Sequence, residues 1–311
     1  MVTVSVIIPI YNGEADLRDL LDCLLKQTYP SDQVEYLLVD NNSSDRTAHH
    51  LQQAVQTFQD HHLTLRPLSQ PDIQSSYAAR NTGIRAAQGQ LCAFTDADCR
   101  PQPNWLTHLL QPFEKPDIGI VAGEIIALPS HTFLERYADK KDTLSQKHTL
   151  NHPFCPYGQT ANLAIRRAIF QEVGLFRPYL TTGGDADICW RILKDSQWQI
   201  ELAPQAIIRH RHRATLAELR SQWRRYGKSN RYLHDLYGVD LMRPFSVKYS
   251  TYLLTRWLLK DLPKNTVKLL LRRANLLDMV RTPLDLVTFQ ARSEGQQTAQ
   301  LPEKASMIEY F

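Results

Sequence analysis

In the first hundred residues, short continuous apolar runs alternate with segments whose apolar residues repeat at helical spacing. The run VTVSVIIPI (residues 2–10) is rich in β-branched residues and is followed by the polar turn YNGE, which predicts a buried strand. Residues 14–29 then carry five leucines at the spacing of an amphipathic helix. The same alternation predicts further strands at 34–40, 63–69 and 90–96 and further helices at 43–58 and 76–89.

Strands that alternate with helices of this length indicate an α/β fold with a parallel sheet and helices on both faces. In such sheets ligands bind at the carboxyl ends of the strands. Three of the predicted strands end in polar clusters, namely YNGE, DNNSSD and TDADC. Three clusters at the same edge of one sheet predict a binding site there.

Beyond Pro103 the pattern is less regular. We expect helices at 104–113 and 132–147, a strand at 119–128, a strand leading into a helix at 160–176, a loop leading into a helix at 183–196, and a strand pair at 198–212. From Thr215 onward the chain is predicted to be helical. The polar residues 291–311 are expected to form a flexible tail.

Charge is distributed unevenly along the chain of 311 residues. The net charge of +4 gives no general case for nucleic-acid binding. Residues 246–281 hold eight basic and two acidic residues, which sum to +6 and leave −2 for the remainder. The basic residues are Lys248, Arg256, Lys260, Lys264, Lys268, Arg272, Arg273 and Arg281.

Within residues 246–290 these basic residues alternate with Leu, Trp and Tyr, and Pro263 and Pro283 interrupt the pattern. Basic amphipathic helices of this kind bind anionic membrane surfaces. The alternative is a helical layer packed on the rest of the protein with its charges in water. The pattern is compatible with peripheral contact of 246–290 with an anionic membrane and leaves both interpretations open.

The five cysteines, Cys23, Cys92, Cys99, Cys155 and Cys189, include no C-x-x-C pair and are expected to be buried free thiols in a reducing compartment. The N-terminal apolar run is too short for a signal peptide, and no apolar stretch is long enough to span a bilayer. We therefore expect a cytoplasmic location, with the protein peripheral at the inner face of the membrane.

Two aspartates close the predicted strand at 90–96. Residues i and i+2 of an extended segment point to the same side, so Asp96 and Asp98 can bind one Mg²⁺ or Mn²⁺. The alternative is a turn or a helix cap. Asp40, at another strand end, can accept a hydrogen bond from a base or can begin an Asx-turn.

The segments VSVIIPIYNGEADLRDLLDCLLKQTYP, YLLVDNNSSDRT, AARNTGIRAAQG, FTDADCRPQPNWL and GGDADICWRI resemble, in this order, the family 2 glycosyltransferases of the GT-A fold. These enzymes move a sugar from a nucleotide-activated donor to an acceptor hydroxyl. The resemblance implies a Rossmann-like, mostly parallel sheet flanked by helices, with a helical C-terminal extension. The implied organisation is a catalytic domain at 1–215, with a nucleotide-sugar half at 1–105 and an acceptor half at 106–215. A helical basic extension at 216–290 and the tail at 291–311 complete it.

The resemblance also implies roles for single residues. The first-strand signature lines the nucleoside pocket, Asp40 contacts the base, and Asp96 belongs to the same nucleotide-sugar site. UDP is the favoured nucleotide. Asn41 stands where the family often has a second aspartate, and this departure leaves the choice between UDP and GDP open. The signature residues are Pro9, Tyr11, Asn12 and Glu14, and the residues expected at the ribose and diphosphate are Arg80 and Asn81.

For the metal and the base, Asp96 and Asp98 match the D-x-D motif that holds Mn²⁺ or Mg²⁺, with Asp98 as the direct ligand. His210 is the expected third ligand or a contact to the diphosphate, with His212 and a plain surface loop as alternatives. Asp185 matches the general base, although its position also suits a helix N-cap. Gly184 replaces the first acid of the family's pair, and Asp187 with Arg191 is expected to be structural.

The resulting expectation is an inverting glycosyltransferase that uses a UDP-sugar and a saccharide or lipid-linked acceptor in polysaccharide, glycolipid or cell-envelope glycan synthesis, without nucleic acid. One alternative is a sugar nucleotidyltransferase, which needs a glycine-rich loop after the first strand that IPIYNGE lacks. The other is a non-catalytic module that binds a nucleotide or a sugar.

Overall fold

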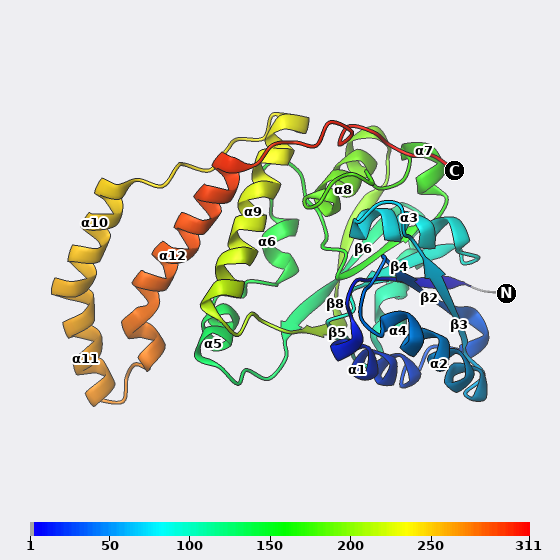
Figure 1. Cartoon of the computed structure of the whole chain (residues 1–311), viewed down its shortest axis with the longest axis horizontal. Coiled ribbons are helices and arrows are strands. Elements are labelled where there is room, and N and C mark those ends of the chain that lie inside the picture. Colours follow the sequence, from blue (N-terminus) through cyan, green and yellow to red (C-terminus); the bar gives the residue numbers. More distant parts are fainter. Residues whose placement is uncertain (1–2) are drawn as a thin grey trace. The chain divides into compact units, whose positions relative to one another are not determined.

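The structure is a computed structural model that describes residues 3–311 (Figure 1). The chain forms two compact units. The first comprises the chain up to Leu128, Leu144–Arg211 and Pro302–Phe311, and the second comprises Pro129–Thr143 and His212–Leu301. Each unit is described by itself below.

The first unit is built on an eight-stranded sheet in the order β3-β2-β1-β4-β7-β6-β8-β5. β1 pairs in parallel with β2 and β4, β2 with β3, and β6 with β8, while β7 and β5 are antiparallel to their neighbours. This is the mostly parallel sheet that the alternation predicted. The strands are β1 (Val4–Ile10), β2 (Val34–Asp40), β3 (Thr64–Ser69), β4 (Leu91–Thr95), β5 (Cys99–Pro101), β6 (Ile118–Ala127), β7 (Asn162–Arg166) and β8 (Gln199–His210).

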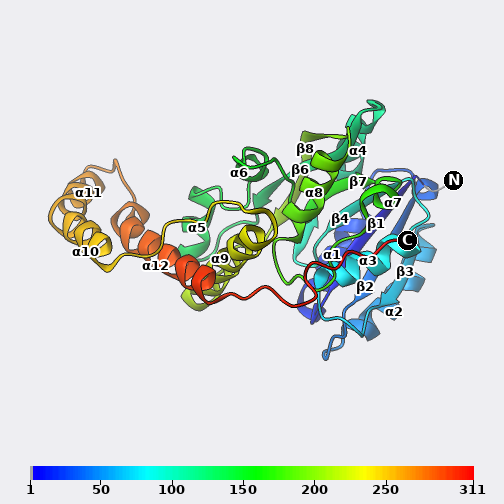
Figure 2. The same cartoon turned by 90° about the horizontal axis from the view of Figure 1, so that it is seen from above.

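Helices cover both faces of this sheet, and they can be followed in Figure 2. Successive residues of a strand point to opposite faces. Val6 and Ile8 of β1 belong to the core that also contains apolar residues of α1, α2 and α4, whereas Ile7 faces Gly83 of α3. The helices of the first unit are α1 (Glu14–Leu25), η1 (Ser31–Gln33), α2 (Thr47–Asp60), α3 (Ser76–Ala86), α4 (Trp105–Leu110), η2 (Gln111–Glu114), α6 (Gln146–Leu150), α7 (Ile169–Val173) and α8 (Gly184–Asp195).

The three polar clusters follow the carboxyl ends of three adjacent strands. β2, β1 and β4 are neighbours in the sheet and end at Asp40, Ile10 and Thr95. The backbone N–H of Asn41 donates to the carbonyl of Ile10 over 2.8 Å, which ties the first two ends together. The topology therefore brings the clusters to one edge, as the sequence predicted.

The second unit is helical. It contains α5 (Phe133–Lys140), α9 (Leu216–Tyr237), α10 (Val247–Arg256), the π-helical turn η3 (Trp257–Asp261), α11 (Leu262–Leu270) and α12 (Leu276–Thr298). α9 and α12 approach closely where Gly227 faces the carbonyl of Arg292 and Gly295 faces the carbonyl of Arg224. Both glycines lack the side chain that would hold the helices apart.

Two expectations differ from the structure. The predicted strand pair at 198–212 is one strand, β8, whose register against β6 shifts between Gly123 and Glu124. Residues 291–298, expected in a flexible tail, are the last turns of α12. Ala305, farther along, is fully buried. Composition misled here because the polar side chains of the final segment find partners, as Glu309 does with Arg85 and Asn81.

Candidate active site

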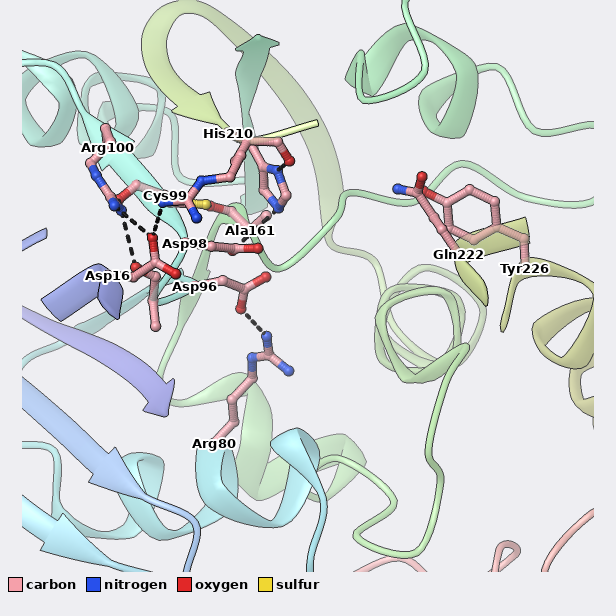
Figure 3. Close-up of polar contacts among 12 residues, drawn as sticks. Asp16, Arg80, Asp96, Asp98, Cys99, Arg100, Ala161, His210, Gln222 and Tyr226 are labelled. Carbon is pink, nitrogen blue, oxygen red and sulfur yellow. Dashed lines mark hydrogen bonds and ion pairs between the residues drawn. The ribbon is translucent and has the colours of Figure 1, made fainter. Parts of the chain in front are cut away.

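The first component of the site is a buried ion pair. Asp96 follows β4, and its Oδ1 accepts a hydrogen bond of 2.6 Å from Nη2 of Arg80 on α3 (Figure 3). The Arg80 side chain is only 3% exposed, so its charge is removed from water and depends on Asp96 for compensation. The Nε atom of Arg80 is also buried and has no hydrogen-bond partner. Arg80 therefore presents unused donor capacity beside the D-x-D segment.

The second component is the contact between Asp98 and His210. β5 runs antiparallel to β8 and pairs Cys99 with His210, which places the imidazole beside the preceding aspartate. His210 Nε2 lies 3.3 Å from Asp98 Oδ1. Burial disfavours the charged imidazolium, but the carboxylates of Asp98 and Asp96 outweigh it and raise the pKa of His210.

The tautomer of His210 follows from its other nitrogen. Nδ1 lies 2.7 Å from the carbonyl oxygen of Arg211, and a carbonyl only accepts hydrogen bonds, so Nδ1 carries a proton. In the neutral ring Nε2 then holds the lone pair and faces Asp98. This is the arrangement that a metal-binding histidine adopts.

Asp98, Cys99 and His210 each offer a ligand atom, and these atoms lie within 4.8 Å of one another. Burial raises the pKa of the Cys99 thiol well above its usual range, and the thiol lies 3.9 Å from the carbonyl of Ala161. The thiolate is therefore disfavoured, which leaves a carboxylate oxygen and an imidazole nitrogen. These donors fit Mn²⁺ and, through the carboxylates, Mg²⁺.

The third component is Asp185, in the first turn of α8. Gly183 adopts a left-handed conformation with φ of 81° and occupies the N-cap position of α8, so Asp185 is not the cap. Its Oδ1 accepts a hydrogen bond of 2.8 Å from the Thr160 hydroxyl. The backbone N–H of Thr160 also stabilises this carboxylate, and Asp185 remains partly exposed.

Burial raises the pKa of Asp185 above its usual value, and Asp96 adds to the increase, while Arg80 and the Thr160 hydroxyl oppose it. Gly184, the residue before Asp185, lies against the ring of Tyr77, and the Arg80 guanidinium lies over that ring, which places Asp185 near the Arg80–Asp96 pair. The structure thus brings together residues from α3, the end of β4, the end of β8 and the start of α8.

Asp187 is structural, as the sequence predicted. It is fully buried and receives Arg177 Nε over 2.7 Å and Arg191 Nη2 over 3.1 Å. This arginine pair holds the first turn of α8 against the preceding loop.

The absence of an acid at Gly184 has a physical reason. A Cβ at this position would lie 2.7 Å from ring atoms of Tyr77 on α3. The Tyr77 ring is stacked on Phe176 and lies beneath the Arg80 guanidinium, with centroid distances of 5.8 and 5.5 Å. Tyr77 thus occupies the space that a side chain at residue 184 would need.

The expected nucleoside-side residues lie in and after β1 and β2. Pro9 is buried within β1, whereas the Tyr11 side chain is 56% exposed. Asn12 adopts φ of 49° and accepts a hydrogen bond from the N–H of Ser44. Glu14 pairs with Arg46 over 2.7 Å. Asn12 and Glu14 therefore join the loop after β1 to the loop after β2.

Asp40 and Asn81 already have partners within the protein. Asp40 Oδ1 accepts a hydrogen bond from the N–H of Ser43, which is the Asx-turn alternative, and its side chain remains partly exposed. Asn81 donates to the carbonyl of Phe176 and accepts from its N–H. Asn81 thus forms hydrogen bonds with Phe176, which precedes α8, whereas Arg80 pairs with Asp96 of the D-x-D segment.

Three contributors were not predicted from the sequence. Thr160 orients Asp185, Tyr77 packs against Gly184, and Arg100 donates to the carbonyls of Ala97 and Cys99 while pairing with Asp16 over 2.7 Å. The basic residue after the D-x-D motif was a weak signal for Arg100. Thr160 and Tyr77 lie far from their partners in sequence and carried no local signal.

Residues 5–174 match the family model described as "Glycosyl transferase family 2". Residues 93–282 match the model described as "Glycosyl transferase family group 2". Glycosyltransferase AglE from Haloferax volcanii is 32% identical over 246 residues, which cover 78% of either chain. The pre-mycofactocin glycosyltransferase from Mycobacterium tuberculosis is 28% identical over 231 residues, covering 73% of this chain and 46% of that relative.

Solved structures of low sequence identity share the fold. The mannosyltransferase PcManGT from Pyrobaculum calidifontis, in complex with GDP-Man and Mn²⁺, superposes with a TM-score of 0.65 at 17% identity, covering 95% of this chain and 87% of that one. S. aureus TarS 1–349 in complex with UDP-GlcNAc gives 0.55 at 15% identity, with coverage of 97% and 95%.

The match across residues 5–174, the similarity to AglE over most of both chains and the GT-A architecture lead to one conclusion: this chain belongs to glycosyl transferase family 2.

Proposed function

We propose that this protein is an inverting, metal-dependent glycosyltransferase that takes a sugar from a nucleoside-diphosphate donor, with UDP favoured. The observation that carries the proposal is the convergence of Asp98 with His210, Asp96 with Arg80, and Asp185 at one edge of the sheet. The catalytic domain in this proposal spans 1–215, with the nucleotide-sugar half at about 1–105.

In this proposal Asp98 and His210 hold Mn²⁺ or Mg²⁺, with Asp96 assisting. When bound, such an ion supplies Lewis-acid stabilisation of the charge that develops on the leaving diphosphate. Arg80, whose Nε has no partner, adds a fixed positive charge on the same side. Tyr11, Asn12 and Asp40 are proposed to border the nucleoside.

Asp185 acts as the general base. Its Oδ1 is held by Thr160, and the other oxygen takes the proton of the acceptor hydroxyl while the hydroxyl oxygen attacks the anomeric carbon. Attack opposite the leaving diphosphate inverts the configuration at that carbon. The raised pKa suits a base that must accept a proton, and the positive charge of Arg80 favours the ionised form of the carboxylate.

PcManGT is solved with GDP-Man and Mn²⁺, and TarS 1–349 with UDP-GlcNAc; these ligands support a nucleotide-sugar donor here without deciding its base. We propose a saccharide or lipid-linked acceptor in polysaccharide, glycolipid or cell-envelope glycan synthesis. The proposed location is the cytoplasm, at the inner face of a membrane.

The proposal is tested by screening UDP- and GDP-sugars with Mn²⁺ for thermal stabilisation, then measuring release of the nucleoside diphosphate. Asp98→Ala is expected to remove the metal-dependent stabilisation. Asp185→Asn is expected to retain donor binding and lower turnover at least about a hundredfold. Asp195→Asn, at the exposed end of the same helix as Asp185, is the matched control and should behave like the natural protein.

Three outcomes would reject the proposal. Turnover that is unchanged in Asp98→Ala and Asp185→Asn would remove both residues from the site. Metal-dependent nucleotide binding without any release of nucleoside diphosphate would indicate a binding module, and release of pyrophosphate from UTP and a sugar phosphate would indicate a nucleotidyltransferase.

A further inference from the structure

Helices α10, η3 and α11 of the second unit bury almost none of their side chains. Ser250 is their only buried residue in the described structure. Of the eighteen large apolar side chains that are exposed among residues 3–311, twelve lie between Leu241 and Leu276. The most exposed are Leu270, Val247 and Leu259, at 79%, 74% and 73%. An apolar surface of this extent marks an interaction site.

These three helices lie within a strongly basic part of the chain. Residues 246–281 carry a net charge of +6, from eight cations and two anions. Lys260, Lys264 and Lys268 are all exposed and lie among the exposed leucines. The segment therefore offers apolar contact and positive charge together.

Three features give the segment a defined shape. α10, η3 and α11 follow one another without a break (Figure 1). The π-helical turn has a local cause, because Pro263 has no N–H to donate to the preceding turn, and Leu262 N–H donates to the carbonyl of Trp257 instead. Trp257 Nε1 donates to the carbonyl of Met279 and Asn265 to that of Asp278, which anchors the segment to α12.

A groove of about 520 Å³ lies on this segment. It is lined by Tyr252, Thr255, Arg256, Leu259 and Lys260. Two cations beside an aromatic and an aliphatic side chain suit a phosphate headgroup next to the start of an acyl chain.

We propose that α10, η3 and α11 bind the surface of an anionic lipid bilayer, with the exposed apolar side chains entering the headgroup boundary and the lysines contacting lipid phosphates. No helix among residues 3–311 is both long and apolar enough to cross a bilayer, so the proposed contact lies along the surface. A second copy of the chain fits less well, because residues 246–281 of the two copies, each with a net charge of +6, would repel each other.

The test is flotation of the full-length protein with vesicles of phosphatidylcholine alone or of phosphatidylcholine mixed with phosphatidylglycerol. We expect binding to the mixed vesicles only, with a loss as NaCl is added, since salt screens the lipid charge. Leu258→Ser/Leu259→Ser and Lys264→Glu/Lys268→Glu should each weaken the partition at least about tenfold.

The matched control is Arg18→Glu/Lys26→Glu, which reverses two exposed charges, one on α1 and one at its C-cap, and should float like the natural protein. Circular dichroism and the thermal unfolding of each variant show that it is folded. Flotation does not measure turnover. The test of membrane binding therefore remains valid if the proposed enzymatic function is wrong.

The proposal is overturned if the natural protein floats with neither kind of vesicle. It is equally overturned if the leucine variant floats as well as the natural protein. A dimer in light scattering that Leu258→Ser/Leu259→Ser converts to a monomer, without vesicle binding, would assign the surface to a second copy.

Discussion

At the residue scale, the ionisation of Asp185 is set by groups that lie far from it in the sequence. Burial raises its pKa, whereas Arg80 and the Thr160 hydroxyl lower it. Thr160 is itself only 2% exposed, so water cannot readily replace its hydrogen bond. The strength of the proposed base therefore depends on one neutral hydroxyl and one buried cation.

Replacing Thr160 with Val should raise the pKa of Asp185 further, because a donor to the ionised carboxylate is lost. A base works only when deprotonated, so the acidic limb of the kcat/KM profile should move to higher pH. Activity should fall more at acidic than at alkaline pH. Thr160→Ser keeps the hydroxyl and should keep the profile. A uniform loss at every pH in Thr160→Val would show that Thr160 acts only on packing.

Gly184→Ala should reduce the free energy of unfolding by about 1–3 kcal/mol, because the added Cβ meets the Tyr77 ring at 2.7 Å. Chemical denaturation measures the loss. In Gly184→Ala/Tyr77→Ala the contact is gone, so the double variant should lose less free energy of unfolding than the sum of the losses in the two single variants. Strict additivity would mean that Tyr77 is not what excludes a side chain at residue 184.

At the element scale, the second unit depends on the close approach of α9 and α12. A Cβ at Gly227 would lie 1.9 Å from the carbonyl oxygen of Arg292, and one at Gly295 would lie 2.1 Å from that of Arg224. Both contacts are with backbone, which cannot rotate away as a side chain can. Only glycine permits this crossing.

Gly227→Ala and Gly295→Ala should each lower the free energy of unfolding by about 3 kcal/mol or more, because the helices must separate. The measurement is chemical denaturation followed by circular dichroism. Gly238→Ala is the comparison, since its Cβ would meet nothing within 4 Å and only its φ of 70° is unfavourable. It should cost about 1 kcal/mol. Equal losses in all three variants would contradict the packing argument.

The C-terminal segment of the first unit, residues 302–311, is a second element whose contacts can be tested. The Leu175 N–H donates to the carbonyl of Glu309 over 2.7 Å, and the Glu309 carboxylate pairs with Arg85 over 2.8 Å. Ser306 accepts from Arg177, which also pairs with the buried Asp187. The segment thus joins α3 to the chain that precedes α8.

Deleting residues 302–311 should lower the melting temperature by about 5 °C, because charged hydrogen bonds to partly buried groups are lost. Glu309→Gln should give a smaller decrease, since the backbone contact remains. Differential scanning calorimetry measures both. An unchanged melting temperature in the deletion variant would mean that the segment contributes nothing to stability.

At the scale of the whole molecule, the two units carry different proposed activities. The carboxylates and His210 belong to the first unit, and the basic apolar helices belong to the second. Chemistry and membrane binding are therefore expected to respond to different conditions.

Chelation by EDTA should abolish turnover and leave flotation with anionic vesicles unchanged, because no proposed metal ligand lies in residues 246–281. Added NaCl should release the protein from vesicles while donor binding persists. Parallel flotation and thermal-shift measurements check both. Loss of vesicle binding in EDTA would show that the metal site and the helical segment are coupled.

The sequence by itself determined the features that depend on local periodicity and local chemistry. Apolar runs alternating with amphipathic segments predicted the parallel part of the sheet, and the order of the strands placed three polar clusters at one edge. The charge and aromatic content of 246–281 was also visible without a structure. The D-x-D segment and Asp185 remain predictions of role, although the structure places them near one another.

Only the tertiary structure decided which distant residues meet. The pairing of β5 with β8 brings His210 to Asp98, and packing of the loop before β7 against α8 brings Thr160 to Asp185. It also changed the expectation for residues 291–311, whose polar side chains have partners in the folded chain. The physical reason is the same in each case. Periodicity indicates which face of an element is buried, whereas strand pairing and side-chain packing decide which residue from a distant part of the sequence contacts that face.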